Sequence, residues 1–406
     1  MKTVFDPRIQ EITQYYSHSF KSLLYKLVEL ESPSHKPEYV DRVLDLLQAE
    51  CQQLGYRTFR YPSQEKAGQL LAYPKERVKN RSNQLLLGHC DTVWDTGMLE
   101  NMPLYEHEDL IYGPGIYDMK AGVAMIITAL NILQELEIEP AVTPVLLFTG
   151  DEETDSEYSK NHITMLARLA ERVFVLEPSL GEKGLIKTTR KGVGHYRLII
   201  KGRASHAGLE PEKGRSAILE LSYLIQKLFA LNNAQNGITV NVGTVDGGIR
   251  PNVIAPESSA MVDVRVNKDK DARLIHELIS DLKPTDPDFE LRVEGGFERP
   301  PMEFTPRNKQ LWKMVQSLAP KAGLTIESGK SGGASDGNFT SRYTATLDGL
   351  GAVGGGAHAK HEHIHFKKTL KRLELLTLLI MQPSITAGNN PNGEKQNLEY
   401  DSATSK

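Results

Sequence analysis

The sequence is poor in cysteine and in long apolar runs and has no excess of positive charge, and each of these features excludes a class of protein. Its 406 residues include two cysteines, too few for a disulfide framework or a thiolate zinc site. The formal net charge of -4 argues against nucleic-acid binding. No stretch approaches the ~18 apolar residues of a membrane helix, and the first ten residues are too polar for a signal peptide. We therefore expect a cytoplasmic protein without nucleic-acid or membrane partners, in which histidines and carboxylates hold any metal.

The length and the pattern of apolar residues predict two domains of an α/β protein. A chain of 406 residues exceeds the size at which one hydrophobic core stops growing. Residues 1–191 and 304–385 are predicted to form one domain with a central sheet flanked by helices. Residues 192–303 follow the order strand, helix, strand, strand, helix, strand, which predicts an inserted ferredoxin-like domain. The polar residues 386–406 are predicted to be a disordered tail.

A short polar stretch, residues 88–93 (GHCDTV), follows the apolar run of leucines at 85–87. This pattern is typical of a buried parallel strand, and α/β sheets bind ligands at the carboxyl ends of such strands. His89 and Asp91 are two residues apart, so His89 could bind a metal while Asp91 orients its ring. Taken alone, a loop histidine beside a capping aspartate is the better explanation.

Further carboxylates follow at similar junctions, and their repeated position favours a metal site. The stretch 151–153 (DEE) follows the apolar strand 145–150, and Glu177 follows the strand 172–176. Acidic residues that converge on a crevice repel one another and raise the free energy of the fold unless a cation neutralises them. A single acidic loop alone would not indicate a metal site. Asp118 precedes an apolar helix in the stretch 113–120 (GPGIYDMK). The lack of a third glycine there, together with the negative charge, argues against a nucleotide-binding loop.

Six motifs in order resemble those of a known enzyme family. The chain from about residue 20 to residue 383 is similar to the glutamate carboxypeptidase, aminoacylase and succinyl-diaminopimelate desuccinylase family of dinuclear zinc hydrolases. The motifs are 88–93 (GHCDTV), 113–120 (GPGIYDMK), 149–153 (TGDEE), 177–179 (EPS), 202–208 (GRASHAG) and 356–358 (GAH). The stretches 177–179 and 190–192 (RKG) are most similar to the glutamate carboxypeptidase branch. The resemblance implies a zinc-peptidase-type α/β fold with an inserted lid and dimerisation domain.

The resemblance also implies two Zn²⁺ ions, with Co²⁺ or Mn²⁺ as alternatives. Asp118 would bridge the two ions, with one imidazole and one carboxylate completing each site. The five implied ligands are His89, Asp118, Glu153, Glu177 and His358. Two such ions can share a water and lower its pKa toward about 7. Glu152 would be the general base and Asp91 the residue that orients His89.

The choice of His358 depends on its context. Three further histidines follow it, His361, His363 and His365, and they are expected to be exposed. His358 is preferred because it follows 354–357 (GGGA) and because Glu362 stands four residues later.

Three residues of the inserted domain are implied to contact the substrate. In the family, a histidine at the position of His206 reaches across a dimer to donate to the oxyanion, so the resemblance implies a homodimer. Taken alone, His206 is better explained as a turn residue. Asn252 and Arg265 resemble the positions that hold the substrate's carbonyl and carboxylate, although Arg265 would also suit a salt bridge on the strand surface. The glycines at 332, 333 and 337 could present N–H groups to the same anion.

The sequence therefore predicts a metal-dependent amide hydrolase. The favoured reaction removes a C-terminal amino acid, with glutamate as one candidate, from a small peptide or N-acyl amino acid. The alternative with the same chemistry is an N-acyl amino acid deacylase or a dipeptidase. An alternative of another class is a relative that only binds an amino acid conjugate and would show no chelator-sensitive hydrolysis.

Overall fold

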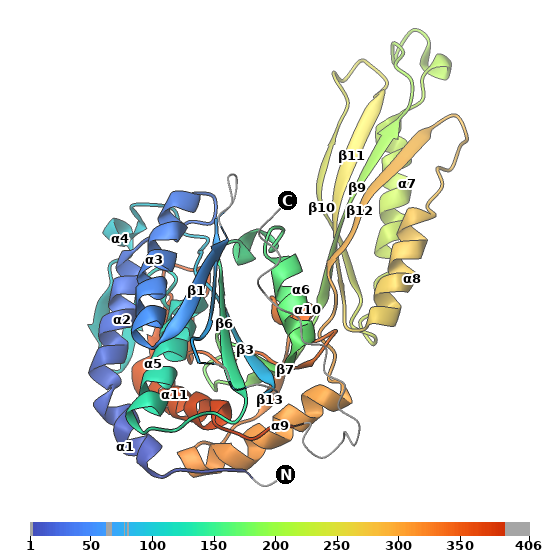
Figure 1. Cartoon of the computed structure of the whole chain (residues 1–406). Coiled ribbons are helices and arrows are strands. Elements are labelled where there is room, and N and C mark those ends of the chain that lie inside the picture. The colour runs from blue at the N-terminus through green and yellow to red at the C-terminus, as the bar shows by residue number, and fades with distance from the viewer. Residues whose placement is uncertain (1–2, 62–66, 77, 79–80, 386–406) are drawn as a thin grey trace.

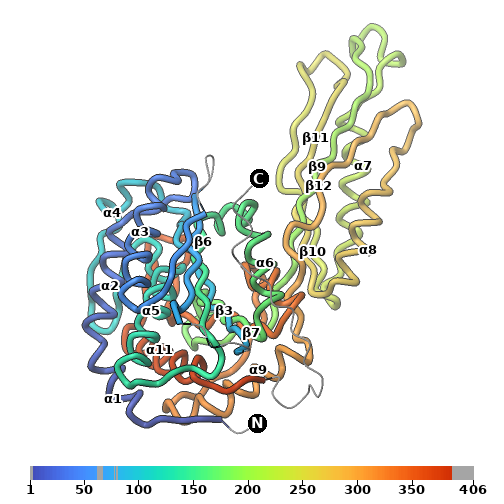
Figure 2. The backbone as a smooth tube through the Cα atoms, in the orientation of Figure 1, coloured from blue at the N-terminus to red at the C-terminus, as the bar shows by residue number. Residues whose placement is uncertain are grey.

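The computed structural model of the chain describes residues 3–61, 67–76, 78 and 81–385. The predicted disordered tail, 386–406, lies outside these residues. Figure 1 shows a large α/β part and, projecting from it, an elongated smaller part built from the middle of the sequence. The backbone trace in Figure 2 shows that chain segments before and after this smaller part together make the larger one.

The larger part is built on a six-stranded sheet in the order β1-β2-β6-β3-β7-β14. Four neighbouring strands run parallel, and β1 and β2 continue the sheet in antiparallel fashion. The strands are β1 (Tyr56–Tyr61), β2 (Gln69–Pro74), β3 (Asn83–His89), β6 (Thr143–Thr149), β7 (Ala170–Val175) and β14 (Ala345–Leu347). In the register of this sheet His89 pairs with Thr149, and Leu87 pairs with Val175. The carboxyl ends of β3, β6 and β7 therefore lie side by side.

Both faces of the six-stranded sheet are buried. Leu86, Leu146 and Phe174 point into the large core beneath most of the helices, whereas Leu85 and Leu147 point into a smaller core on the opposite face. The helices of the large core are α1 (Arg8–Tyr15), α2 (Ser17–Glu29), α3 (Pro37–Gln53), α5 (Ala121–Glu135), α9 (Pro306–Leu318) and α11 (Phe366–Ile380). The smaller core is covered by α6 (Lys160–Leu169) with α10 (Gly337–Thr340) beside it. The predicted α/β class with a central sheet flanked by helices is confirmed.

Two helical segments of the larger part differ from simple long helices. The N-terminal helical region is divided at Tyr16, which ends α1 before α2 begins. The helix Ile116–Glu135 has 20 residues and a mean hydropathy of 1.4, so by length and composition it could cross a membrane. It is the only such helix in the described part of the chain, and 89% of its most apolar window is buried, as in a core helix.

The smaller part is a four-stranded antiparallel sheet in the order β10-β11-β9-β12 with its own core. Its elements are β9 (Gly192–Lys201), α7 (Ala217–Phe229), β10 (Thr239–Gly247), β11 (Glu257–Val266), α8 (Asp269–Ser280) and β12 (Glu290–Arg299). Their order along the chain is the ferredoxin-like order. The helices α7 and α8 cover one face of this sheet (Figure 1). The role of this part as a lid and dimerisation domain stays a prediction.

Short elements frame the carboxyl edge of the large sheet. One small sheet has the order β15-β16-β5-β4, and β13 pairs with β8 in another. Their strands are β4 (Tyr105–His107), β5 (Leu110–Tyr112), β8 (Ile186–Arg190), β13 (Ser328–Ser331), β15 (Gly354–Gly355) and β16 (His363–His365). The remaining helical segments are α4 (Met98–Asn101), η1 (Ile116–Lys120), η2 (Glu152–Thr154), η3 (Pro211–Lys213) and η4 (Ala319–Ala322).

Candidate metal centre

All five residues implied as metal ligands lie at one edge of the large sheet. His89 ends β3, Glu153 lies in η2 directly after β6, and Glu177 follows β7. Asp118 lies in η1, and His358 lies between β15 and β16. Segments far apart in the sequence converge here because parallel strands end at the same edge of a sheet.

His89 is buried and touches two of the carboxylates. Its Nε2 lies 3.3 Å from Asp118 Oδ1 and 3.5 Å from Glu177 Oε1. Its Nδ1 lies 3.0 Å from the backbone carbonyl oxygen of Asp91, which can only accept a hydrogen bond. The proton therefore belongs on Nδ1, and the Nε2 lone pair faces the carboxylates, as a metal ligand requires.

His358 approaches the same aspartate from the other side. Its Nε2 lies 3.7 Å from Asp118 Oδ2 and 3.3 Å from Glu153 Oε1. Asp118 thus directs one oxygen toward each histidine, which is the arrangement of a carboxylate that bridges two cations. Both His358 and Gly356 have positive φ, 60° and 77°, so a left-handed turn of the backbone presents the imidazole.

Asp91 contacts His89 and also holds the segment η2, which carries Glu152 and Glu153. Its buried carboxylate accepts hydrogen bonds from the Ser34 hydroxyl at 2.7 Å and from the backbone N–H groups of Glu152 and Glu153 at 3.2 and 3.1 Å. The same carboxylate lies 3.4 Å from His89 Nδ1, farther than the Asp91 carbonyl. The backbone carbonyl of Asp91 therefore contributes most to the predicted orientation of His89. The side chain of Asp91 positions η2.

The two oxygens of Glu177 face different partners. Oε1 faces His89, whereas Oε2 accepts a hydrogen bond from Arg190 Nη2 at 2.8 Å and lies 3.7 Å from Lys187 Nζ. Burial alone would raise the pKa of Glu177, but Arg190, His89 and Lys187 together hold it well below its usual value. Arg190 also pairs with the buried Asp348 at 2.7 Å. These cations keep Glu177 ionised with one oxygen directed toward the centre.

The loop that carries Asp118 is held by Glu362, for which the sequence predicted no role beyond marking His358. Its fully buried carboxylate accepts hydrogen bonds from the backbone N–H groups of Gly115, Tyr117 and Asp118 at 2.9–3.0 Å, and from Trp94 Nε1 at 2.7 Å. Burial raises the pKa of Glu362 to about 7, and hydrogen bonds from Asp118, Gly115 and Trp94 offset this only in part. Glu362 therefore positions the loop of Asp118, the aspartate that the resemblance implies as the bridging ligand.

We expect Glu362→Gln to weaken metal binding by about 10–100-fold, the usual effect of removing a group that orients a ligand. The amide turns an NH₂ group toward backbone N–H donors, so the loop at Asp118 loses part of its support. Competition for Zn²⁺ with a chromophoric chelator measures the change. Glu374→Gln, which alters a buried carboxylate paired with Lys371 on α11, is the matched control. Equal zinc affinity in both variants would contradict the role of Glu362.

Glu152 lies beside the five residues without being one of them. One of its carboxylate oxygens is within 4.8 Å of ligand atoms of His89 and Glu177. Glu152 Oε1 also lies 3.1 Å from Nη1 of the buried Arg299, which comes from the end of β12. Burial raises the pKa of Glu152 well above its usual value, and the charge of Arg299 acts in the opposite direction. Arg299 was not anticipated because nothing near it in the sequence marks it as part of this site.

The structure separates one of the three predicted substrate contacts, Arg265, from the other two. His206 and Asn252 are exposed and lie in neighbouring segments: His206 bridges to Val253, and the Ala207 N–H donates to the Asn252 carbonyl at 3.0 Å. The segment of His206 joins β9 to α7 at the end of the smaller sheet that is remote from the larger part (Figure 1). Arg265 lies at the near end, where it pairs with Asp263 at 3.0 Å, the strand-surface salt bridge left open as an alternative.

Two of the glycines considered for anion binding have other partners. The N–H of Gly333 donates to the Ser331 hydroxyl at 3.3 Å, and that of Gly337 donates to the Ser335 hydroxyl at 3.0 Å. The carbonyl of Gly333 accepts from Arg190 at 3.1 Å. This segment therefore supports Arg190, and the contact of these glycines with a substrate anion stays a prediction.

Comparison with known proteins gives consistent matches over most of the chain. The sequence profile of peptidase family M20/M25/M40 matches residues 85–382. Carboxypeptidase G2 of Pseudomonas sp. (strain RS-16) is 29% identical over 368 residues, 88% of each chain. Succinyl-diaminopimelate desuccinylase of Maricaulis maris is 28% identical over 342 residues, 79% of this chain and 85% of the relative. The crystal structure of the Bacillus subtilis YXEP protein, a dinuclear metal-binding peptidase of the M20 family, superposes with a TM-score of 0.65 at 12% identity, covering 91% of this chain and 98% of that one.

Proposed function

This chain belongs to peptidase family M20/M25/M40, a family of metal-dependent hydrolases, and from that premise we propose that it is a dinuclear zinc carboxypeptidase. It would release a C-terminal amino acid from small peptides or N-acyl amino acids. The observation that carries the proposal is the position of Asp118, with Oδ1 3.3 Å from Nε2 of His89 and Oδ2 3.7 Å from Nε2 of His358.

The donor set fits two zinc ions. Asp118, Glu153 and Glu177 supply three carboxylates, and His89 and His358 supply two imidazoles, the nitrogen and oxygen ligands that Zn²⁺ takes. Three negative charges against four positive ones leave the centre close to neutral. When bound, the two ions would polarise the scissile carbonyl and lower the pKa of a water molecule.

Glu152 is proposed as the residue that moves the proton. It would take the proton of the attacking water and deliver it to the leaving amine. The contact with Arg299 fixes the direction of the carboxylate, and the hydrogen bond from its own backbone N–H to Asp91 fixes the backbone. The Glu152 side chain is only 11% exposed, which shields the transferred proton from most of the bulk water.

The substrate proposal rests on the relatives and on Arg265. Carboxypeptidase G2, 29% identical over 88% of each chain, is named for release of a C-terminal residue, and a guanidinium such as that of Arg265 can bind a free carboxylate in a bidentate manner. The second candidate is an N-acyl amino acid deacylase, which the similarity to succinyl-diaminopimelate desuccinylase favours. Both reactions use the same centre and differ in which side of the amide is recognised.

We expect hydrolysis by the purified protein to be lost on treatment with a chelator and restored by Zn²⁺, because five side chains of the centre would lose the ions that they hold. The assay uses a panel of dipeptides and N-acyl amino acids with acidic, basic and apolar C-terminal residues. A rate that does not depend on the C-terminal side chain would contradict a preference for glutamate. No turnover with or without metal would instead support the non-catalytic alternative.

A further inference from the structure

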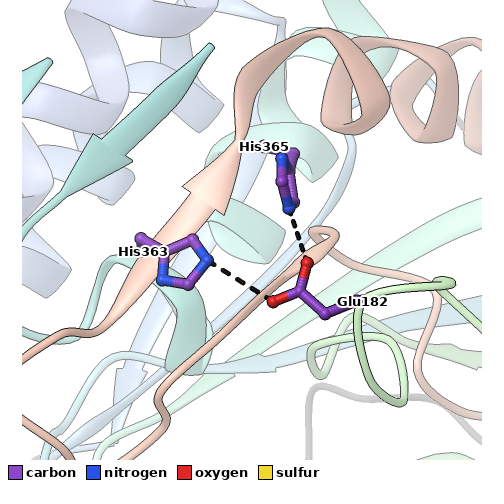
Figure 3. A group of neighbouring side chains, drawn as sticks. All are labelled: Glu182, His363 and His365. Carbon is purple, nitrogen blue, oxygen red and sulfur yellow. Dashed lines mark hydrogen bonds and ion pairs between the residues drawn. The ribbon is translucent and has the colours of Figure 1, made fainter. Parts of the chain in front are cut away.

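Outside the proposed dinuclear centre, Glu182, His363 and His365 form a second cluster of metal-ligand side chains (Figure 3). His365 Nε2 lies 2.8 Å from Glu182 Oε2, and His363 Nε2 lies 3.8 Å from Glu182 Oε1. One ligand atom of each residue lies within 4.8 Å of those of the other two. The expectation that these two histidines are exposed is wrong, because both are largely buried and face the same carboxylate.

The protonation of His363 favours a metal. Its Nδ1 lies 2.8 Å from the backbone carbonyl oxygen of His361, so Nδ1 donates and Nε2 carries a lone pair. That lone pair faces a carboxylate, which has no proton to donate when it is ionised. Two acceptors directed at one another are stabilised by a cation between them, and a ring fixed through its other nitrogen is typical of metal-binding histidines.

The backbone of β16 directs the imidazoles of His363 and His365 to the same face of its small sheet. His363 and His365 are alternate residues of β16, and their backbones pair with Tyr112 and Leu110 of β5. Their ring centroids are 5.7 Å apart. A side chain at position 355 would begin 3.4 Å from Glu182 Oε1 and 3.9 Å from His363 Nε2, so the glycine there leaves room for an ion and its waters.

We propose that Glu182, His363 and His365 bind a third metal ion, a divalent transition metal of which Zn²⁺ is the one to test. Two imidazole nitrogens and one carboxylate oxygen are a preferred zinc donor set, with water completing the coordination. Metal–ligand bonds of about 2.0–2.1 Å imply that two ligand atoms of a tetrahedral site are about 3.3 Å apart. The distances from Glu182 to His365 and to His363, 2.8 and 3.8 Å, lie on either side of this value. Lys368, which donates to the Glu182 carbonyl at 3.2 Å, places a positive charge nearby, so the affinity depends on the imidazoles.

This ion would join two segments of the dinuclear centre. Glu182 follows Glu177 by five residues, and His363 follows His358 by five residues. The third site is outside the group of residues that would act on the substrate, so its role is to fix the loops that carry one candidate ligand of each zinc ion.

The test counts zinc in the full-length protein after removal of metal and reloading with excess Zn²⁺, by mass spectrometry of gel-filtered samples. We expect one equivalent fewer in the double variant His363→Ala, His365→Ala than in the wild type. Glu182→Gln, a conservative change of a side chain that is 66% exposed, is expected to lose the same equivalent and guards against misfolding of the double variant. His361→Ala is the matched control, because this exposed neighbour contributes only its backbone carbonyl.

An equal zinc content in wild type, Glu182→Gln and the double variant would overturn the proposal and leave His365 and Glu182 as an ion pair. Asp118→Asn separates this result from the dinuclear centre, because it should lower zinc binding there and keep the third equivalent. Loss of every equivalent in Asp118→Asn would also overturn the third site. Zinc content unchanged by Asp118→Asn, together with one equivalent lost in Glu182→Gln, would support the third site and contradict the dinuclear one.

Discussion

Glu152→Gln is expected to lower kcat by about 10²–10⁴-fold while the zinc content stays at the wild-type value. The amide has nearly the shape of the carboxylate and keeps an oxygen for Arg299, so the loop should remain in place. It cannot take up a proton at neutral pH, so the water loses its base and the amine its acid. Steady-state kinetics on the best substrate of the panel and zinc analysis of the same sample measure the two quantities.

Glu153→Gln is the matched comparison, because it makes the same chemical change one residue later in η2. Glu153 Oε1 lies 3.3 Å from His358 Nε2, whereas Glu152 Oε1 lies 3.1 Å from Arg299 Nη1. We therefore expect Glu153→Gln to lose zinc as well as activity. Full activity of Glu152→Gln would remove Glu152 as the base, and loss of zinc in that variant would show that Glu152 is a ligand.

The sequence was sufficient for the part of the site that is encoded locally. The apolar run before His89 predicts a buried strand, and the strand β3 ends at this residue. The apolar runs before Glu153 and Glu177 predict strands in the same way, and parallel strands of one sheet must end together. The family predicted from six motifs is confirmed, because each motif is a short local sequence that can be read without the fold.

The groups that hold these side chains in place were not predictable in the same way. Glu362 and Gly115 are separated by 247 positions, and Arg299 approaches Asp336 and Glu152 from another sheet. A charged residue in a strand is usually exposed, and only the packing of the two parts shows that Arg299 is buried. Local patterns predict where a strand ends. They do not show which residues, distant in the sequence, contact the side chains at that end.

His206 is remote from the metal centre of its own chain, so its predicted role requires a dimer. Ten residues of β9 span roughly 30 Å, and His206 lies beyond the far end of that strand. Its Nδ1 accepts hydrogen bonds from the N–H groups of Gly208 and Leu209 at 3.1 and 3.2 Å, so Nε2 carries the proton and is a donor. Such a group suits a developing oxyanion, and from this remote position we expect it to act on one in another chain.

The smaller part also has a surface suited to a second copy. β10 is an edge strand, and Val245 within it and Ile249 just after it are 56% and 68% exposed. Ile218 and Leu219 of the adjacent α7 are exposed as well. Apolar side chains next to an unpaired strand edge are unfavourable in water, and association of two copies through this surface would cover them.

A heterodimer of His206→Ala and Glu152→Gln subunits, purified through two different tags, should recover about half of the wild-type activity per dimer, although each homodimer is nearly inactive. If His206 acts across the interface, the subunit with intact Glu152 receives its histidine from the other chain, and the second site carries both defects. A heterodimer of His358→Ala and Glu152→Gln is the matched control. Both of its changes affect the chain that carries them, so neither site is complete and no activity should return. Failure of the first heterodimer to exceed this control would show that His206 does not complete the site of its partner.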